Sequence, residues 1–306
     1  MNILPNDLPT KVSVIIPAYN AENCITEAID SILNQHYKSL EIIVVNDCSR
    51  DETLEVLKRY TDKLTILTNK TNMGASYSRN QGIKIASGEY IAFLDADDIW
   101  YPNKLSRQIQ IMKMYPDCSF SYGKDVRVKF DEYNSNVLID TDNSLTLHTK
   151  KEFVEIFENP YFSTSTIMIS RQHCLNNGGF REDIKTAEDI DFCYKSTSNT
   201  LTIALDFPLS VTRRISDSLG ASATSYSDNL FVIDDFLNKN PSFANHQERI
   251  ISNIKRRIYD SWVSDLIYQR KINKAITILF KSMHVKPSPL SIKLLIKALL
   301  LWIKQR

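Results

Sequence analysis

The first third of the chain alternates between short, continuous apolar runs and segments whose apolar residues recur at helical spacing. An apolar run of about four to eight residues bounded by turn residues is typical of a buried strand. Apolar residues three and four positions apart, such as Ile25, Ala28, Ile29 and Ile32, are typical of a helix with one buried face. The pattern predicts strands in residues 11–20, 40–47, 63–69 and 89–95, and helices in residues 21–35, 51–60, 74–87 and 102–113.

This alternation predicts a sheet built from strand–helix–strand units. Parallel strands with helices on both faces are buried on both sides, which explains why these runs are apolar throughout. The expected fold class is α/β, with a mostly parallel central sheet flanked by helices. In such sheets ligands bind beyond the carboxyl ends of the strands. Three of the expected strands end there in polar residues, at 17–20, 46–47 and 95–98.

The rest of the chain follows a different pattern. Residues 119–215 mix short strand candidates with one expected helix at 188–198, and from about residue 226 the pattern is helical to the end. We therefore expect two domains, residues 1–220 with the sheet and residues 221–306 as a helical region for oligomerisation or association with a membrane surface.

The composition indicates a sizeable core and balanced charge. Of 306 residues, 43% are hydrophobic, and the 37 lysines and arginines nearly balance the 36 aspartates and glutamates, which argues against a general nucleic-acid binder. Five scattered cysteines form no CxxC pair, so we expect reduced thiols and neither a disulfide framework nor a zinc site. Because no signal pattern or membrane-length apolar span is visible, the expected location is the cytoplasm.

Three carboxylates follow the fourth expected strand, in the segment "FLDADD". Side chains alternate along a strand, so Asp95 and Asp97 are expected on one side and Asp98 elsewhere. Two carboxylates at a strand end can hold Mg²⁺ or Mn²⁺, and such an ion would neutralise charge on a leaving diphosphate. The alternative is an acidic turn that caps the next helix.

Two further residues are candidates for contact with a nucleotide. Asp47 ends the second expected strand, where an ionised carboxylate can accept the N3–H of a uracil or thymine ring. Arg79 lies in the helix that follows Gly74 and can pair with a carboxylate or a phosphate. A turn aspartate and a solvated helical arginine are the alternatives, and the pattern alone leaves them open.

Together these segments resemble the family 2 glycosyltransferases with the GT-A fold. The resemblance rests on "VSVIIPAYNAENCITEAIDSILNQ", "EIIVVNDCSRDET" and "NMGASYSRNQGIKIASGEYIAFLDADD", followed by "PNKL". It is dense over residues 12 to about 110 and thinner to about 219. The resemblance implies a Rossmann-like sheet and transfer of a sugar from a nucleotide sugar to an acceptor hydroxyl, with inversion at the anomeric carbon.

The resemblance also implies roles for single residues at the strand ends. Asp47 matches the family's base-contacting carboxylate, although the acid that often precedes it is Asn46 here. Asp97 is the expected metal ligand, and Asp95 is expected nearer the ribose. The remaining residues expected to bind the nucleotide sugar are Pro17, Tyr19 and Asn20, in the first nucleotide-binding turn, and Arg79.

A catalytic base is expected further along the chain. Glu188, Asp189 and Asp191 gather at the start of an expected helix. The helix dipole favours acids there, and a carboxylate can also act as a general base. The "ED" resembles the family's catalytic-base motif, which implies Asp189 as the base, Glu188 as a positioning group and Asp191 as the substitute. The preceding residues 178–180, "GGF", resemble the acceptor-side loop.

Residues 211–222 resemble a loop that folds over the diphosphate in many family members. Arg213 and Arg214 are expected to bind phosphate, and the alternative is a solvated basic turn. No histidine follows them that could be a metal ligand.

The chain has no QxxRW sequence and resembles processive, polymer-extruding members poorly. We therefore expect one sugar to be transferred in each catalytic event.

The last segment, residues 286–306, is an apolar helix with Lys293, Lys297 and Lys304 along one stripe. This pattern fits an anionic membrane surface, and it fits equally well packing against the preceding helices or a second subunit.

The combined hypothesis is an inverting, metal-dependent, non-processive glycosyltransferase of bacterial surface-polysaccharide synthesis. The expected donor is a UDP-sugar, the cofactor Mn²⁺ or Mg²⁺, and the acceptor a glycan or lipid-linked glycan. A sugar-phosphate nucleotidyltransferase is one rival, although the first strand ends in "PAYN" without a glycine-rich loop. A non-catalytic nucleotide-sugar-binding or scaffold protein is the other.

Overall fold

The computed structural model describes residues 10–129, 148–160, 163–214 and 225–304. Contacts divide the chain into two compact units. The first, here called the sheet unit, comprises Met1–Asp183 and Phe192–Ser218, and the second, the helical unit, comprises Ile184–Asp191 and Leu219–Arg306.

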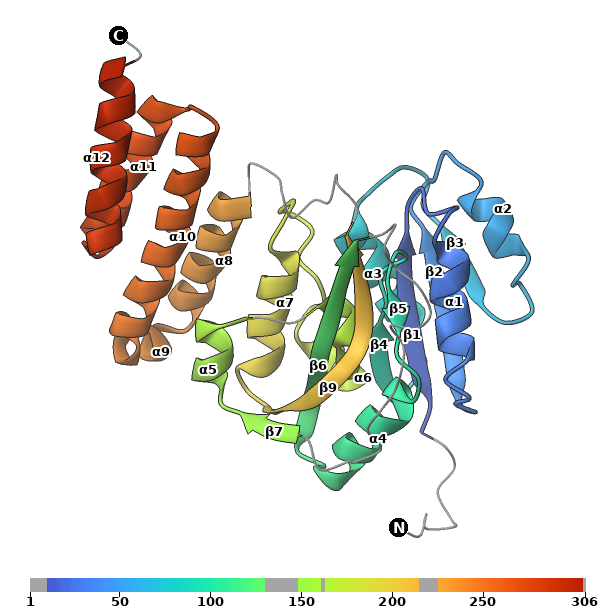
Figure 1. Ribbon diagram of the computed structural model, residues 1–306. Helices are drawn as coiled ribbons and strands as arrows, with labels where there is room; N and C mark the ends of the chain where they lie inside the picture. The colour runs from blue at the N-terminus through green and yellow to red at the C-terminus, as the bar shows by residue number, and fades with distance from the viewer. Residues whose placement is uncertain (1–9, 130–147, 161–162, 215–224, 305–306) are drawn as a thin grey trace. The chain divides into compact units, whose positions relative to one another are not determined.

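The strands of the described residues form one sheet in the order β3-β2-β1-β4-β8-β6-β9-β5, with β7 paired to β9 (Figure 1). Their bounds are Val12–Ala18 for β1, Leu40–Asn46 for β2, Thr65–Thr68 for β3, Tyr90–Phe93 for β4, Ile99–Trp100 for β5, Cys118–Lys129 for β6, His148–Lys151 for β7, Met168–Ser170 for β8 and Leu201–Arg214 for β9.

The first four strands are parallel, which confirms the strand–helix–strand prediction. The helices α1 (Ile25–Leu33), α2 (Thr53–Lys58) and α3 (Ala75–Ile85) connect them. The second half of the sheet is mixed, because β8 runs antiparallel to both β4 and β6 whereas β6 and β9 are parallel. The expectation of a mostly parallel sheet therefore holds for its amino-terminal half.

Alternate residues of each parallel strand pack into cores on opposite faces of the sheet. Val14 and Ile16 belong to one core with buried residues of α1, α2 and α4 (Lys104–Met114), whereas the Ile15 side chain lies against Gly82 of α3 on the other face. α6 (Arg171–Asn176) and the carboxyl-terminal part of α7 (Glu188–Thr197) cover that second face further along. Because both faces are covered, polar side chains reach solvent at the ends of the strands.

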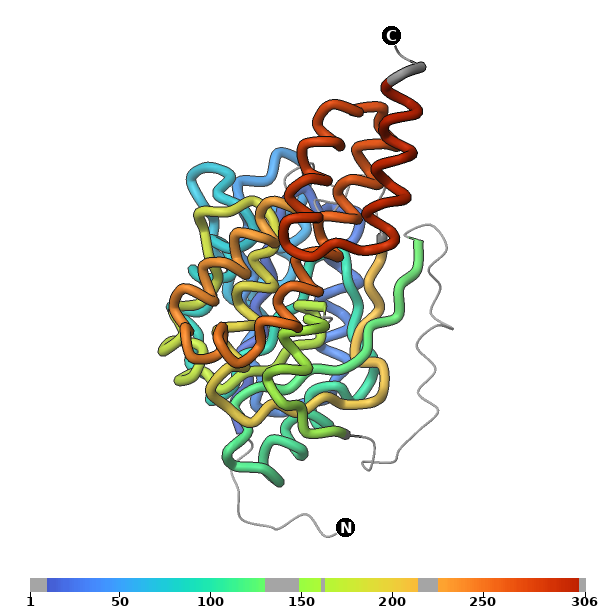
Figure 2. Tube along the Cα trace, turned by 90° about the vertical axis from the view of Figure 1, so that its left-hand side faces the viewer, coloured from blue at the N-terminus to red at the C-terminus, as the bar shows by residue number. Residues whose placement is uncertain are grey.

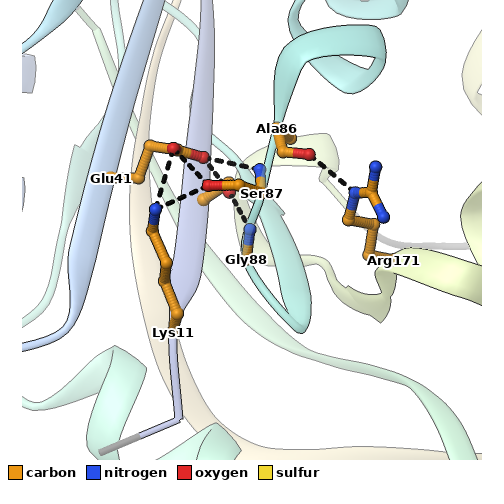
Figure 3. Close-up of polar contacts among 7 residues, drawn as sticks. Lys11, Glu41, Ala86, Ser87, Gly88 and Arg171 are labelled. Atoms are coloured by element: carbon orange, nitrogen blue, oxygen red, sulfur yellow. Dashed lines mark hydrogen bonds and ion pairs between the residues drawn. The ribbon is translucent and has the colours of Figure 1, made fainter.

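Glu41 ties together the amino-terminal ends of β1 and β2 and the turn before β4 (Figure 3). Its carboxylate accepts hydrogen bonds from Lys11 Nζ at 3.0 Å, Ser13 Oγ at 2.5 Å, and Ser87 Oγ and N at 2.6 and 2.8 Å. Gly88 donates its backbone N–H to Ser13 Oγ at 2.8 Å, and a Cβ at Gly88 would lie 2.6 Å from Ser13 N. Partial burial alone would raise the pKa of Glu41, but these donors outweigh it and lower the pKa to about 2.

The helical unit holds the carboxyl-terminal helices with their own core. Its helices are α8 (Ser225–Lys239), α9 (Pro241–His246), α10 (Glu248–Tyr268), α11 (Ile272–Val285) and α12 (Pro289–Lys304). The helical pattern predicted from about residue 226 is confirmed. Within the described part of the chain, no helix combines the length and the apolar character needed to cross a membrane.

The remaining elements are α5 (Phe153–Glu158) and the short 3-10 helix η3 (Thr164–Thr166). All five cysteines lie in described segments and are free thiols. α4 begins at Lys104, two residues after Pro102, because Asn103 has a left-handed backbone conformation.

Candidate active site

The turn after β1 is bonded to the turn after β2. Asn20, at φ +49°, donates its backbone N–H to Ser49 Oγ at 3.0 Å and accepts a hydrogen bond from Arg50 N at 2.9 Å through its side chain. Pro17 lies within β1, opposite Val45 of β2. Tyr19 remains 43% exposed. The structure therefore places an open aromatic ring at the carboxyl end of β1.

Asp47 is buried directly after β2 and anchors the loop that leads to α3. One carboxylate oxygen accepts hydrogen bonds from Asn69 Nδ2 at 2.7 Å and Met73 N at 2.9 Å, and the other from Gly74 N at 2.7 Å. Gly74 adopts φ +89°, where a side chain would be strained. The turn role that the sequence left open is thus present, and contact with a nucleotide base stays a prediction.

The three aspartates of "DADD" occupy different surroundings. Asp98 is buried and accepts hydrogen bonds from Ser165 Oγ at 2.5 Å and Arg213 N at 3.2 Å. Burial, together with the charges of Asp95 and Asp97, raises the pKa of Asp98 well above its ordinary value. Asp98 therefore fastens the strand-end loop to η3 and β9, and the cation hypothesis concerns Asp95 and Asp97.

Asp95 forms an ion pair with Arg79, with 2.6 Å between Asp95 Oδ1 and Arg79 Nη2. Arg79 is buried, and its guanidinium lies over the Phe180 ring at 5.0 Å. The backbone N–H of Asp95 donates to Ser165 Oγ at 3.1 Å. Of the two partners the sequence allowed for Arg79, the structure shows the carboxylate.

Asp97 is partly buried. Burial and the nearby charge of Asp95 raise its pKa to about 6, although the positive charges of Arg213 and Arg79 act to lower it. Arg213 is buried; it donates through Nε to the main-chain oxygen of Asp97 and pairs through Nη1 with the carboxylate of Glu27 in α1. Arg213 thus holds the loop in place, and phosphate binding by it stays a prediction.

These residues fit a divalent cation. Two carboxylates stand one residue apart, and burial, together with the charge of Asp95, raises the pKa of Asp97 and so disfavours its ionised form in the absence of a cation. Carboxylate oxygens are the ligands that Mg²⁺ and Mn²⁺ prefer. Within the described residues, no three or more histidine, cysteine or acidic side chains are placed so that they could hold a metal ion together, so a cation here would take its other ligands from diphosphate oxygens and water.

The expected diphosphate loop reaches the limit of the described residues at Arg214. Arg214 is the last residue of β9, and its Cα lies opposite that of Lys129 in the parallel register with β6. The rest of the expected diphosphate loop, residues 215–222, lies outside the described residues.

The loop before α7 contains two glycines with positive φ. Gly178 and Gly179 have φ of +77° and +68°, and a Cβ at Gly179 would lie 2.5 Å from Asn80 Oδ1. Asn80 accepts a hydrogen bond from Phe180 N and donates one to Phe180 O, both at 2.8 Å. Phe180 in turn stacks on Phe192 with ring centroids 4.0 Å apart. This loop is therefore rigidly joined to α3, the helix that carries Arg79.

The expected catalytic acids lie in the first turn of α7, as predicted. Glu188 and Asp189 line a hollow of about 260 Å³ in the helical unit, together with residues 185–187, Ile190, Ser225 and Asn229. Thr186 donates to the Asp228 carboxylate through Oγ1 at 2.8 Å, which joins this loop to α8. Asp189 Oδ1 accepts the N–H of Ile190 at 2.8 Å. Asp191 is buried and does not line the hollow.

Comparison with known proteins identifies the family. Residues 13–175, more than half of the chain, match the family model described as glycosyl transferase family 2. This chain belongs to glycosyl transferase family 2.

Two bacterial relatives of this family 2 protein have names that state a glycosyltransferase activity. The Escherichia coli UDP-Glc:alpha-D-GlcNAc-diphosphoundecaprenol beta-1,3-glucosyltransferase WfgD is 42% identical over 129 residues, covering 42% of this chain and 49% of WfgD. TuaG of Bacillus subtilis, named for teichuronic acid biosynthesis, is 32% identical over 182 residues, covering 57% of this chain and 69% of TuaG. The chain thus spans about half the length of WfgD.

Solved structures share the fold of the family 2 chain. S. aureus TarS 1–349 in complex with UDP-GlcNAc superposes with a TM-score of 0.71 at 22% identity, covering 92% of this chain and 82% of that one. The mannosyltransferase PcManGT from Pyrobaculum calidifontis, in complex with GDP-Man and Mn²⁺, gives 0.61 at 20% identity, covering 96% and 81%. The GT-A fold predicted from the sequence is confirmed.

Proposed function

We propose that this family 2 protein is a non-processive, inverting glycosyltransferase of bacterial surface-polysaccharide synthesis. The observation that carries the proposal is the pair Asp95 and Asp97 at the carboxyl end of β4, next to the buried cations Arg79 and Arg213. A fixed cluster of carboxylates and guanidinium groups at this edge of a parallel sheet suits a nucleotide diphosphate with its metal ion.

The proposed donor is a UDP-sugar. The name of WfgD includes UDP-Glc, and TarS was crystallised with UDP-GlcNAc, and both support a uridine nucleotide in the donor. PcManGT, crystallised with GDP-Man, is a counterexample. Tyr19 and Asn20 border the carboxyl end of β1, and Asp47 that of β2. Asp47 has three hydrogen-bond donors on its carboxylate, which leaves room for about one more, the N3–H of the base.

Asp97 is the proposed protein ligand of Mn²⁺ or Mg²⁺, with Asp95 beside it near the ribose. When bound, the ion would neutralise charge on the departing diphosphate. Arg79 holds Asp95 in place, and Arg213 holds the main chain of Asp97. These contacts hold the side chain of Asp95 and the main chain of Asp97 before donor binds, which lowers the entropy lost on binding.

Asp189 is the proposed general base, which takes the proton of the acceptor hydroxyl as that oxygen attacks the anomeric carbon opposite the leaving group. Glu188 beside it is the proposed positioning group. The hollow that both acids line gives an acceptor hydroxyl access to them. The proposed acceptor is a glycan or lipid-linked glycan, by analogy with the GlcNAc-diphosphoundecaprenol in the name of WfgD.

Slow donor hydrolysis tests this proposal without knowledge of the acceptor. Release of nucleoside diphosphate is measured from UDP- and GDP-sugars with Mn²⁺, Mg²⁺ or EDTA. We expect metal-dependent release from a UDP-sugar, about 100-fold slower in Asp97→Asn and Asp189→Asn. Asp62→Asn, an exposed aspartate after α2, is the matched control and should retain full activity.

Two results would contradict the proposal. Donor binding without any release, even with cell-envelope extract as acceptor and unchanged by Asp189→Asn, would indicate a binding or scaffold protein. Formation of a nucleotide sugar from a nucleoside triphosphate and a sugar 1-phosphate would indicate a nucleotidyltransferase.

A further inference from the structure

The last helix, α12, is apolar on two opposite sides. One side, with Leu294 and Ala298, packs into the core formed with α10 and α11. The Cα trace shows these last helices side by side (Figure 2). The other side carries Ile292, Ile296, Leu299 and Leu300, here called the outer stripe, whose spacing of four, three and one places them on one helical face. These four side chains are between 42% and 57% exposed. A surface helix of a globular protein normally presents polar residues there.

A buried polar cluster fixes the rotation of α12 about its axis. Asp260 of α10 accepts hydrogen bonds from Ser282 Oγ at 2.6 Å and Ser291 Oγ at 3.1 Å. Ser288 Oγ accepts the N–H of Ser291 at 3.0 Å, at the start of α12. Turning the outer stripe inward would remove Ser291 from a buried carboxylate, which is costly. The stripe therefore faces away from the core of the helical unit.

The charge around the stripe is of one sign. Lys293 and Lys297 are exposed beside it. From Leu266 to Arg306 the sequence has nine lysines and arginines and no acid. The whole chain has 37 basic and 36 acidic residues. The other 265 residues therefore hold 28 basic and 36 acidic residues, which gives them a formal charge of −8. The positive charge is thus concentrated in the helices that carry the exposed apolar stripe.

We propose that the outer stripe of α12 docks on the surface of an anionic lipid bilayer. The apolar side chains would enter the boundary between headgroups and acyl chains, and Lys293 and Lys297 would pair with anionic headgroups. Symmetric pairing of two copies through this face would bring two acid-free, basic segments together, which charge repulsion opposes. The inference goes beyond the proposed sugar transfer and does not depend on it.

The test is flotation of the full-length protein with vesicles. Neutral phosphatidylcholine vesicles are compared with vesicles that also contain phosphatidylglycerol, at low and high salt. We expect binding to the anionic vesicles that weakens with salt. Ile296→Ser with Leu300→Ser should abolish it, whereas Met114→Ser, an equally exposed apolar residue of α4, should not change it. Lys293→Gln and Lys297→Gln should each weaken binding about fivefold, whereas Lys63→Gln and Lys84→Gln should have no effect.

Three outcomes would overturn the inference. One is equal binding to neutral and anionic vesicles, and another is no loss of binding in the stripe variant. The third is a dimer in analytical ultracentrifugation that the stripe variant dissociates, since the stripe would then be covered by a second copy. Circular dichroism of each variant checks that it folds, and donor hydrolysis without vesicles reports the sugar-transfer proposal separately.

Discussion

At the scale of single residues, one hydroxyl group organises the acidic loop after β4. Ser165 Oγ donates to Asp98 and accepts from the backbone N–H of Asp95. It lies in η3, whose main chain also accepts the Trp100 Nε1–H at 2.7 Å. The position of the proposed metal ligand Asp97, between these two aspartates, therefore depends on Ser165.

Ser165→Ala is expected to impair the site and the fold together. Asp98 would lose its shortest hydrogen bond in a buried place, which costs about 1–3 kcal/mol of unfolding free energy. We also expect a higher Mn²⁺ concentration for half-maximal donor hydrolysis. Urea unfolding and metal titration measure the two effects. Ser106→Ala, an exposed serine of α4, is the control, and a Ser165 variant that matches it would disprove this role.

The Arg79–Asp95 pair should be strongly coupled because Arg79 is buried. A double-mutant cycle with Arg79→Met and Asp95→Asn is expected to give a coupling energy of about 1–3 kcal/mol in urea unfolding. The exposed pair Lys58–Glu55 has the same 2.6 Å separation and should give less than about 0.5 kcal/mol. Equal coupling in the two pairs would show that burial of Arg79 adds nothing.

The sequence could point to the acids of this candidate site but not to their partners. Asp95 and Asp97 were recognisable because they end a buried strand, and Arg79 because of its place in a motif. Ser165 and Glu27 carried no local signal, since a serine in an irregular segment and a glutamate in a first helical turn are common. Glu27 is 186 residues away from its partner Arg213 in the chain, so only the fold brings them together.

At the scale of elements, Glu41 joins three segments of the sheet that meet at its amino-terminal edge. Lys11, Ser13 and Ser87 all donate to its carboxylate, and these hydrogen bonds favour the ionised form of Glu41. The lowered pKa is therefore linked to the stability of β1, β2 and the turn before β4.

Glu41→Gln should destabilise the protein in a pH-dependent way. The pKa of Glu41 is about 2 in the folded protein and about 4.3 in the unfolded chain. Its ionised carboxylate therefore adds to the free energy of unfolding above about pH 4.3, and this contribution is lost as pH falls towards 2. We expect the variant to be about 1–2 kcal/mol less stable at pH 7 and nearly equal to the native protein near pH 2. Urea unfolding at several pH values measures this; Glu55→Gln, which is exposed, should show no such pH dependence.

Sequence patterns predicted the parallel half of the sheet better than the mixed half. β1, β2 and β4 are continuous apolar runs with helices between them, and this alternation predicts that they lie parallel in one sheet. β8 has three residues, and it pairs with β4 across a separation of about 80 residues. Such short strands are specified by the contacts around them, which a periodicity in the chain does not reveal.

At the scale of the whole molecule, the chain has cores that belong to separate units. The sheet unit has one core on each face of the sheet, and the helical unit has its own between α10, α11 and α12. Asp260 with its serine partners lies in the helical core. Regions with separate cores can open separately.

Asp260→Asn should loosen the helical unit and leave the sheet unit unchanged. Its amide cannot accept hydrogen bonds from all three serine hydroxyls as the carboxylate does, so we expect a loss of about 1–3 kcal/mol. Hydrogen exchange should become faster in residues 248–304 and stay the same in β1, β2 and β4. Uniformly faster exchange would instead indicate one cooperative unit.

The segregation of charge along the chain also has a consequence for purification. The intact protein has a formal charge of +1 at pH 7, whereas a chain cleaved after Asp265 would carry −8. A preparation nicked there and stripped of its last 41 residues should bind an anion-exchange column that the intact protein passes through. Elution position alone would then reveal whether the last two helices are still attached.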